Sequence, residues 1–382
     1  MRLQVSEMTQ AQSQVPSQTP PAGQARREGR LADPSVELRT DPRLHPGLRS
    51  ALAAFGMDGH AAPPPMDRSV GEEAVAEFVG GAHAAFEGLY AVLPSEWPGE
   101  VPAVVAYRTE TVRDVDGNDI PLHIFRPAEA AGPLPCVVYL HGGGMTILEA
   151  HNRVHKQWSH DLAATGMTVV TVGFRNAWTA EGLNPFPAGL NDCGTALDWV
   201  HQHRDDLGIT KIVLQGESGG GNLVLATALK AKREERLDRI DGVYAMVPYI
   251  SGGYAWDTDR KLRELPSMVE NDGHYLNCDM MGLLVTVYDP TGDHAEDPLC
   301  WPYFATDSDV EGLPPHAITV NELDPLRDEG IAYFRTLQRA GVRVVGKVNL
   351  GLTHAADMSF RQAVPDGYKA AVRDIHGFAQ SL

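Results

Sequence analysis

A serine flanked by glycines lies at the junction of two different stretches of the chain. Residues 216–220 are Gly-Glu-Ser-Gly-Gly, after the β-branched run Lys211–Gln215 and before Gly221–Lys232, which has helical composition. A strand, a Gly-x-Ser-x-Gly turn and a helix together form a nucleophile elbow, whose tight turn holds the serine hydroxyl above the edge of a sheet. The pattern predicts Ser218 as a catalytic nucleophile. The alternative is an ordinary glycine-rich turn whose serine caps the helix.

A second glycine cluster directly follows a predicted strand. Residues 141–145 are His-Gly-Gly-Gly-Met, after the apolar run Cys136–Leu140. Glycines let backbone N–H groups approach a substrate, and a turn of this type supplies oxyanion donors in acyl-transfer enzymes. We expect the N–H groups of Gly143, Gly144 and Gly219 to form such a site, with His141 fixing the loop by a hydrogen bond. The alternative is a phosphate loop, but neither of its usual glycine signatures is evident.

A serine nucleophile also needs an orienting acid. Asp324 stands at the end of the predicted strand Ala317–Leu323. Glu322 belongs to the other face of that strand, and Asp328 and Glu329 fall in the first turn of the next helix, where acidic residues are favoured as caps. We therefore prefer Asp324, although an Asp-Pro sequence taken alone is usually just a turn.

The base is predicted from its place after the last strand. His354 follows the strand Val342–Val348, and it is the one histidine after Asp324 that falls in a strand-end loop, since His376 lies in the terminal helix. The resulting order of Ser218, Asp324 and His354 is the order of the triad in α/β-hydrolases. Three roles in the expected order and context are more specific than any one motif.

The elements that must position these residues alternate between strand and helix. An antiparallel hairpin is predicted around Asp116-Gly117, between Val104–Val112 and Ile120–Phe125. Further buried strands follow: Cys136–Leu140, Thr168–Val172, Ile212–Gln215, Val243–Val247, Ala317–Val320 and Val342–Val348. The intervening helices include Gly189–Arg204, Asn222–Arg236 and Asp328–Ala340. This alternation predicts an α/β fold of the α/β-hydrolase type, with a mostly parallel sheet flanked by helices.

Two regions outside this alternation predict a helical cap. Residues 1–33 are rich in Gln, Ser, Pro, Ala and Arg and are expected to be a disordered tail. Residues 34–100 contain helices without strands, including an amphipathic one over about 70–93, and residues 101–382 form the catalytic domain. An insertion over about 252–300 is too long for a bare loop, and we expect helices in it at Ser267–Val269 and Met280–Val287.

Several large side chains are candidates for lining a substrate pocket under such a cap. They are Met145, Trp178, Tyr254, Trp256 and Tyr288. The alternative is that these side chains pack the cap against the core.

Composition narrows the class of protein. The net charge of −18 over 382 residues argues against nucleic acid or an anionic membrane as a partner, and no apolar run is long enough to span a bilayer. The four cysteines show no metal-ligand spacing, so free thiols are favoured over a single bridge. The first residues lack the apolar segment of a secretory signal, so the expected location is cytoplasmic. We expect no metal or cofactor.

The chain resembles the hormone-sensitive-lipase family of α/β-hydrolases, the bacterial family IV esterases. The resemblance is carried by motifs spread from about residue 100 to the C-terminus: His141–Gly144, Pro185–Cys193, Gly216–Gly220, Asp324–Glu329 and His354. Two departures lie in the elbow, where Glu217 and Gly219 replace the usual Asp and Ala. Arg175-Asn-Ala also stands where many relatives have Arg-Leu-Ala-Pro.

The resemblance implies hydrolysis of small carboxylic esters without a metal or cofactor, beneath a helical cap. Two other functions stay open at this point. A ligand-binding protein could use the same fold after losing its chemistry, although such relatives typically lack a triad member. An amidase could use the same triad. The sequence does not predict acyl or alcohol size, a preference for lactones or open-chain esters, or the oligomeric state.

Overall fold

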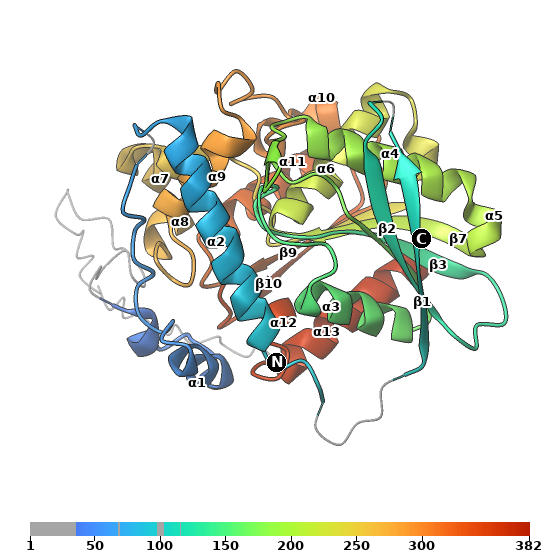
Figure 1. Cartoon of the computed structure of the whole chain (residues 1–382), viewed down its shortest axis with the longest axis horizontal. Coiled ribbons are helices and arrows are strands. Elements are labelled where there is room, and N and C mark those ends of the chain that lie inside the picture. The colour runs from blue at the N-terminus through green and yellow to red at the C-terminus, as the bar shows by residue number, and fades with distance from the viewer. Residues whose placement is uncertain (1–35, 68, 98–102, 115) are drawn as a thin grey trace, which may run out of the picture.

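The computed structural model describes residues 36–67, 69–97, 103–114 and 116–382. Its centre is a sheet of eight strands in the order β1-β2-β4-β3-β7-β8-β9-β10 (Figure 1). The hairpin β1–β2 is antiparallel and β2 pairs antiparallel with β4, whereas the remaining neighbours pair in parallel. This is the predicted α/β-hydrolase arrangement, with an antiparallel opening and a parallel remainder.

The strands of the large sheet differ in how deeply they are buried. Their bounds are β1 Val105–Arg113, β2 Asp119–Pro127, β3 Leu134–Leu140, β4 Thr168–Val172, β7 Ile209–Glu217, β8 Gly242–Met246, β9 His316–Asn321 and β10 Val344–Asn349. Every residue of β4, β8 and β9 is buried, because helices cover both faces of a parallel sheet. The edge strands β1 and β10 are largely exposed. A separate two-stranded sheet joins β5 (Trp178–Thr179) and β6 (Gly182–Leu183).

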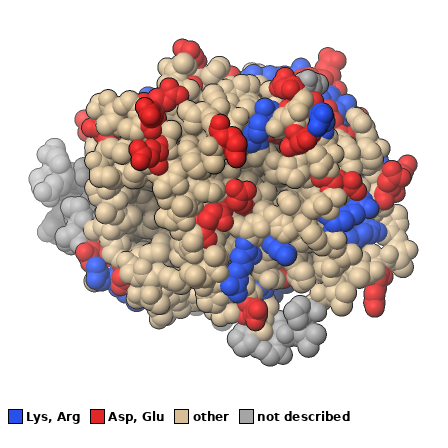
Figure 2. Space-filling view, viewed as in Figure 1, with Lys and Arg blue, Asp and Glu red and all other residues tan. Residues whose placement is uncertain are grey.

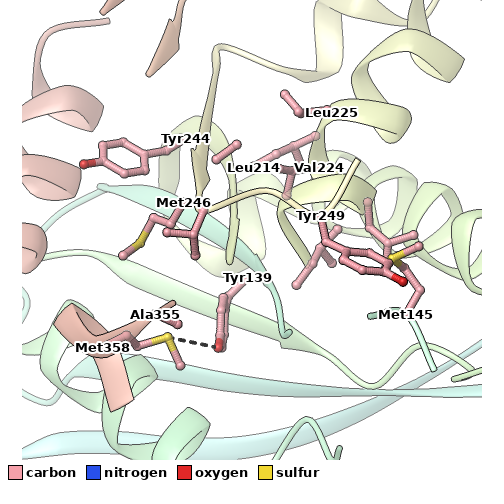
Figure 3. Close-up of a cluster of buried hydrophobic side chains, with 14 of the residues drawn as sticks. Tyr139, Met145, Leu214, Val224, Leu225, Tyr244, Met246, Tyr249, Ala355 and Met358 are labelled. Atoms are coloured by element: carbon pink, nitrogen blue, oxygen red, sulfur yellow. Dashed lines mark hydrogen bonds between the residues drawn. The ribbon is translucent and has the colours of Figure 1, made fainter. Parts of the chain in front are cut away.

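Two groups of helices cover the sheet. Helices α3 (Arg153–Ala164) and α13 (Pro365–Gln380) contact each other and lie on one face. The other face carries α4 (Ala188–Gln202), α6 (Gly219–Arg233) and α11 (Arg327–Arg339), with the short α5 (Arg204–Leu207) and α10 (Asp307–Val310) beside them (Figure 1). Figure 3 shows part of the core between these layers, where the Tyr139 hydroxyl lies 4.0 Å from the sulfur of Met358.

Further helices lie to one side of the sheet. Helices α1 (Pro46–Ala54) and α2 (Glu72–Val92) precede the first strand. The long segment after β8 contains α7 (Thr258–Glu264), α8 (Ser267–Glu270) and α9 (Cys278–Tyr288), and α12 (Ala356–Ser359) follows β10. Helix α2 packs against α9, so segments far apart in sequence meet here (Figure 1).

Charged side chains are scattered over the molecular surface. On the face shown in Figure 2, acidic and basic residues are interspersed in a mostly uncharged surface. No helix in the described part of the chain is long and apolar enough to cross a membrane. All four cysteines are buried and free, as favoured from the sequence.

The element types were predicted more accurately than their bounds. Helix α6 begins at Gly219 and not at Asn222, because the Ser218 carbonyl already accepts the helical hydrogen bond of the Asn222 N–H at 3.0 Å. Strand β7 begins at Ile209, which pairs with Leu134. The predicted helices of the 252–300 segment are present as α8 and α9. The predicted tail, residues 1–33, lies outside the described residues.

Candidate active site

Ser218 occupies the sharp turn between β7 and α6. Its backbone has φ 56° and ψ −118°, a conformation that non-glycine residues rarely adopt. The Ser218 N–H donates to the Met246 carbonyl at 3.0 Å, which ties the turn to the neighbouring strand. The turn is close-packed, since a Cβ added to Gly220 would lie 1.8 Å from the Leu140 carbonyl oxygen. The predicted elbow geometry is therefore present, and it leaves Ser218 partly exposed at the carboxyl end of the sheet.

Asp324 and His354 form a hydrogen-bonded pair near the ends of β9 and β10. The Nδ1 atom of His354 lies 2.8 Å from Oδ2 of Asp324. Asp324 is fully buried and His354 is 5% exposed, so water does not compete strongly for this contact. The second oxygen of Asp324 accepts the Leu326 N–H at 2.9 Å. With Oδ1 held in this way, Oδ2 is left for the imidazole.

The other carboxylates considered as the acid have different partners. Glu322 accepts the Gly351 N–H at 2.8 Å, and Asp328 accepts the Ser267 N–H at 2.7 Å. Glu329 accepts the Tyr254 hydroxyl at 2.7 Å. Among these four acids, Asp324 is the one in hydrogen-bond contact with His354.

The glycine turn after β3 folds back against the elbow. Gly143 has φ 107°, and a Cβ there would lie 2.1 Å from the Ile147 carbonyl oxygen. A Cβ on Gly219 would lie 2.7 Å from the Gly144 nitrogen, so the two predicted donor segments are in direct contact. Backbone N–H groups placed in this way can act together on one oxygen atom. His141 is buried, and its Nδ1 lies 2.7 Å from the Gly142 carbonyl oxygen, which fits the predicted loop-fixing role.

Glu217, the residue before the serine, is a buried carboxylic acid. Its Oε1 accepts the Gly142 N–H at 2.6 Å and the Tyr139 hydroxyl at 3.1 Å. Burial raises the pKa of Glu217 to about 8, against the lowering effect of these hydrogen bonds. Near neutral pH the group is therefore largely protonated. Through the Gly142 N–H, the Glu217 side chain connects the glycine turn to the elbow.

Left-handed backbone conformations gather around these loops. Besides Ser218, positive φ angles occur at Leu148 (75°), Tyr275 (70°) and Ala355 (49°). All four residues line one cavity. Such conformations cost about 1–3 kcal/mol each and persist where the surrounding structure enforces them, which is typical of functional sites.

Ser218 and His354 line this same cavity, whose lining is mainly apolar. Its volume is about 70 Å³. On the sheet side it is bounded by the glycine turn, Glu217, Ser218, His354 and Ala355. On the other side its lining comes from α2 and from the segment ending in α9: Phe86, Tyr90, Tyr275, Leu276, Met280, Met281 and Leu284. Ile147, Leu148 and Tyr249 complete it.

None of the five predicted pocket residues lines this cavity. They are Met145, Trp178, Tyr254, Trp256 and Tyr288. Met145 is buried at the base of the elbow and belongs to the core cluster of Figure 3. The Trp178 ring lies 5.3 Å from the His83 ring and packs β5 against α2.

The remaining three of the five pack the segment after β8 or fix its loops. Tyr254 is fully buried and hydrogen-bonded to Glu329. Trp256 lies beneath the Arg260 guanidinium, 3.6 Å from it. Tyr288 is buried edge-on to neighbouring aromatic rings. The packing alternative therefore describes these side chains.

The actual lining residues left only a weak signal in the sequence. Phe86 belongs to the amphipathic pattern of α2, but such a pattern does not distinguish a core contact from a cavity wall. Met280 and Leu284 are four residues apart in α9 and share one helix face. That apolar face, on a helix inserted outside the sheet, was the sequence feature that could have indicated the cavity wall.

No group of three or more His, Cys, Asp or Glu side chains in the described residues is arranged to hold a metal ion. A strained serine at a strand–helix turn, a buried Asp–His pair and a glycine turn thus lie at the same edge of the sheet, in a fold of the α/β-hydrolase class.

Comparison with known proteins agrees with this class. Residues 137–358 match the family described as the alpha/beta hydrolase fold. The chain is 56% identical to a solved brefeldin A esterase, described as a bacterial homologue of human hormone sensitive lipase, with a TM-score of 0.90 over 92% of this chain and 97% of that one. A structure of esterase Est22 with p-nitrophenol is 35% identical, with a TM-score of 0.79 over 90% and 99% of the two chains.

The names of curated relatives also describe ester hydrolysis. Carboxylesterase NlhH of Mycobacterium tuberculosis is 31% identical over 69% of this chain and 79% of its own length. An ethyl acetate hydrolase of Pseudomonas putida is 29% identical over 63% of this chain and 72% of its own length. The chain belongs to the alpha/beta hydrolase family, within its branch related to hormone-sensitive lipase. It is a carboxylic ester hydrolase.

Proposed function

We propose that the chain hydrolyses small apolar carboxylic esters through an acyl-enzyme on Ser218. His354 is the general base, Asp324 orients it, and the N–H groups of Gly143, Gly144 and Gly219 bind the oxyanion. The observation that carries this proposal is the 2.8 Å contact of the His354 Nδ1 with buried Asp324, at a cavity that His354 shares with Ser218.

The reaction has two halves. In the first, the Ser218 oxygen attacks the ester carbonyl while His354 takes the hydroxyl proton, and the carbonyl oxygen becomes an oxyanion held by the glycine N–H groups. The tetrahedral intermediate collapses, the ester C–O bond breaks, and His354 protonates the leaving alcohol. In the second half, water attacks the acyl carbon while His354 removes a proton from the water. The bond between the acyl carbon and the Ser218 oxygen then breaks, His354 returns the proton to Ser218, and the acid is released.

Asp324 acts through the imidazole. Accepting a hydrogen bond from Nδ1–H keeps the lone pair of Nε2 free for the serine proton and stabilises the imidazolium that forms. The burial of Asp324 strengthens both effects, because the local dielectric is low.

We also propose that α2 and the segment 252–300 form a cap over the site. Both contribute apolar side chains to the cavity, and they pack against each other through α2 and α9. A cavity of about 70 Å³ has room for a few water-sized groups and so suits a short acyl group, since roughly 10–15 Å³ on this measure holds one water.

Replacing Ser218 by Ala tests the nucleophile. We expect hydrolysis of p-nitrophenyl acetate to fall by roughly 10⁴-fold or more, while far-UV circular dichroism and thermal midpoint stay close to those of the unchanged protein. Ser381→Ala, at the end of α13, is the control and should retain activity. Fluorophosphonate should label the unchanged protein and not the Ser218 variant. Retained turnover in S218A would refute the assignment.

Substrate size is tested with p-nitrophenyl esters from acetyl to octanoyl, with brefeldin A, a lactone, as a separate arm. We expect kcat/KM to be highest for acetyl to butyryl esters, because longer chains exceed the cavity. Brefeldin A is included because a solved relative at 56% identity is a brefeldin A esterase. A preference for octanoate would contradict the proposed cavity limit without affecting the triad.

A further inference from the structure

The loop that carries Asp324 is held from outside the sheet by the segment that includes α8. We propose that Asn271, the residue after α8, is a positioning residue for Asp324. Through Asn271, the same segment that lines the cavity also sets the carboxylate that orients His354. This inference rests on the proposed role of Asp324 as the acid of the triad.

Asn271 holds the backbone on both sides of the acid. Its Nδ2 donates to the main-chain carbonyl oxygens of Glu322 and Asp324, each at 3.0 Å. The side chain is fully buried. Because both neighbours are acceptors, the NH₂ end of the amide must face them, which fixes the orientation of the side chain. One amide therefore bridges two peptide groups of the loop.

Helix α8 itself makes further contacts with the same loop. The Ser267 hydroxyl donates to the Pro325 carbonyl at 2.8 Å and accepts the Asp328 N–H at 3.1 Å. Glu270 accepts from Arg327 at 2.8 Å. The loop 322–328 is thus bound to α8 and Asn271 at several points along its length.

The carboxylate itself uses none of these contacts. Its two oxygens are occupied by the Leu326 N–H and by His354. The Asp324 and Glu322 carbonyls would each keep one donor from Arg327 if Asn271 were removed, at 3.2 and 3.1 Å. Loss of the amide would therefore leave no carbonyl without a partner. It would free the loop to shift relative to His354.

Asn271 is also close in sequence to the cavity wall. Its carbonyl accepts the His274 N–H at 3.0 Å, and the next residues, Tyr275 and Leu276, line the cavity. A substrate that contacts this wall therefore touches the same segment that holds the Asp324 loop. Glu270 continues the connection to the N-terminal region, where Arg43 donates to it at 2.6 Å.

The test combines Asn271→Ala with Asp324→Asn in a double-mutant cycle. If Asn271 acts through Asp324, N271A alone should lower kcat for p-nitrophenyl acetate by roughly 10- to 100-fold, as expected when a catalytic group is misplaced by a fraction of an ångström. KM should change little. In the D324N background the same N271A change should cost less than about twofold, because there is no carboxylate left to position.

The split between kcat and KM gives a second readout. A merely structural loss would weaken the cavity wall and raise KM, whereas a displaced Asp324 carboxylate lowers kcat and leaves KM close to its original value.

Asn277→Ala is the matched control. Asn277 lies in the same segment and its Nδ2 also donates to two backbone carbonyls, those of Ala61 and Ala62, at 3.2 and 2.7 Å. We expect N277A to lose thermal stability without lowering kcat. If N271A does not fold, Ser267→Ala, which also releases the loop, replaces it in the cycle.

The outcomes distinguish a failure of the proposed mechanism from a failure of the positioning role alone. Full activity in D324N would remove the proposed acid, and with it the proposed mechanism. Loss of activity in D324N, together with an N271A effect that is absent or equally large in both backgrounds, would overturn the positioning role alone. A smaller N271A effect on kcat in the D324N background, with an unchanged KM, supports it.

Discussion

The two walls of the cavity are built from different parts of the chain. On the sheet side, the wall is mostly backbone: Gly143, Gly144 and the turns at Ser218 and Ala355, with positive φ angles throughout. On the other side, it consists mainly of apolar side chains from α2 and from the segment ending in α9, which are far apart in sequence. The proposed chemistry depends on N–H groups and one strained serine and so tolerates few sequences, whereas an apolar wall can be built from many.

The backbone wall should therefore be the sensitive one. Gly143→Ala places a methyl group about 2.1 Å from the Ile147 carbonyl oxygen, at a φ of 107°. The glycine turn must shift, which moves the proposed oxyanion donors. We expect kcat for p-nitrophenyl acetate to fall roughly 10²–10³-fold, comparable to the removal of one donor.

Gly166→Ala provides the control for this prediction. Gly166 has a φ of 103°, but nothing lies within 4 Å of the added Cβ. The backbone strain is therefore similar, and the steric contact is absent. G166A should lose stability and keep kcat. Equal losses of kcat in both variants would show that strain alone, and not the oxyanion turn, explains the Gly143 result.

The difference between the walls also explains what the sequence could predict. The parallel sheet, the elbow at Ser218 and the Asp324–His354 pair follow from short local patterns at strand ends, because strand order brings those ends together. The apolar wall has no such pattern. Trp178 and Tyr254 were plausible by type but pack within the protein, while Phe86 and Met281 line the cavity only because α2 and α9 meet.

Helix α3 shows a different limit. It was not predicted, although Val154, Trp158 and Leu162 repeat every four residues and are buried. The polar residues between them lower the mean hydropathy, so the period is easily overlooked. Asn271 illustrates a third case: its role depends on two carbonyl groups more than fifty residues away in the chain, which no local pattern contains.

The apolar wall should control substrate size with a smaller effect on the chemistry. Phe86→Ala removes a ring from the cavity lining. We expect kcat/KM for octanoyl relative to acetyl esters to rise roughly tenfold, since one methylene in an apolar pocket is worth about 1–3 kcal/mol. The kcat for the acetyl ester should change little.

Phe78→Ala is the matched control on the same helix. Phe78 packs against the core but does not line the cavity. F78A should lower the thermal midpoint and leave the chain-length profile unchanged. If both variants alter the profile alike, then α2 acts through its overall packing and not through the ring at position 86.

The smallest expected effect on catalysis belongs to Glu217 beneath the backbone wall, where the change falls on stability instead. Burial raises the pKa of Glu217 to about 8, above the ordinary value of 4.5, so the folded protein binds this proton more tightly than the unfolded chain does. The stabilisation from this proton is complete below about pH 4.5 and is lost as pH rises towards 8. Glu217→Gln cannot ionise. It should remove a decline in unfolding free energy of at most about 1.4 kcal/mol per pH unit over that range.

Urea unfolding at pH 5, 6, 7 and 8 measures this slope. Buried His141, whose pKa is lowered to about 4 by burial, contributes with the opposite sign, so the comparison must be between E217Q and the unchanged protein and not between absolute slopes. Glu181→Gln, at an exposed position, should leave the slope as it is. Phe86, Met280 and Met281 in the apolar wall carry no titratable group, so substituting them should not change the slope either. If E217Q keeps the full decline, Glu217 is already ionised in the folded protein. The contact between the glycine turn and the elbow would then be a charged hydrogen bond, and its loss should cost catalysis more than stability.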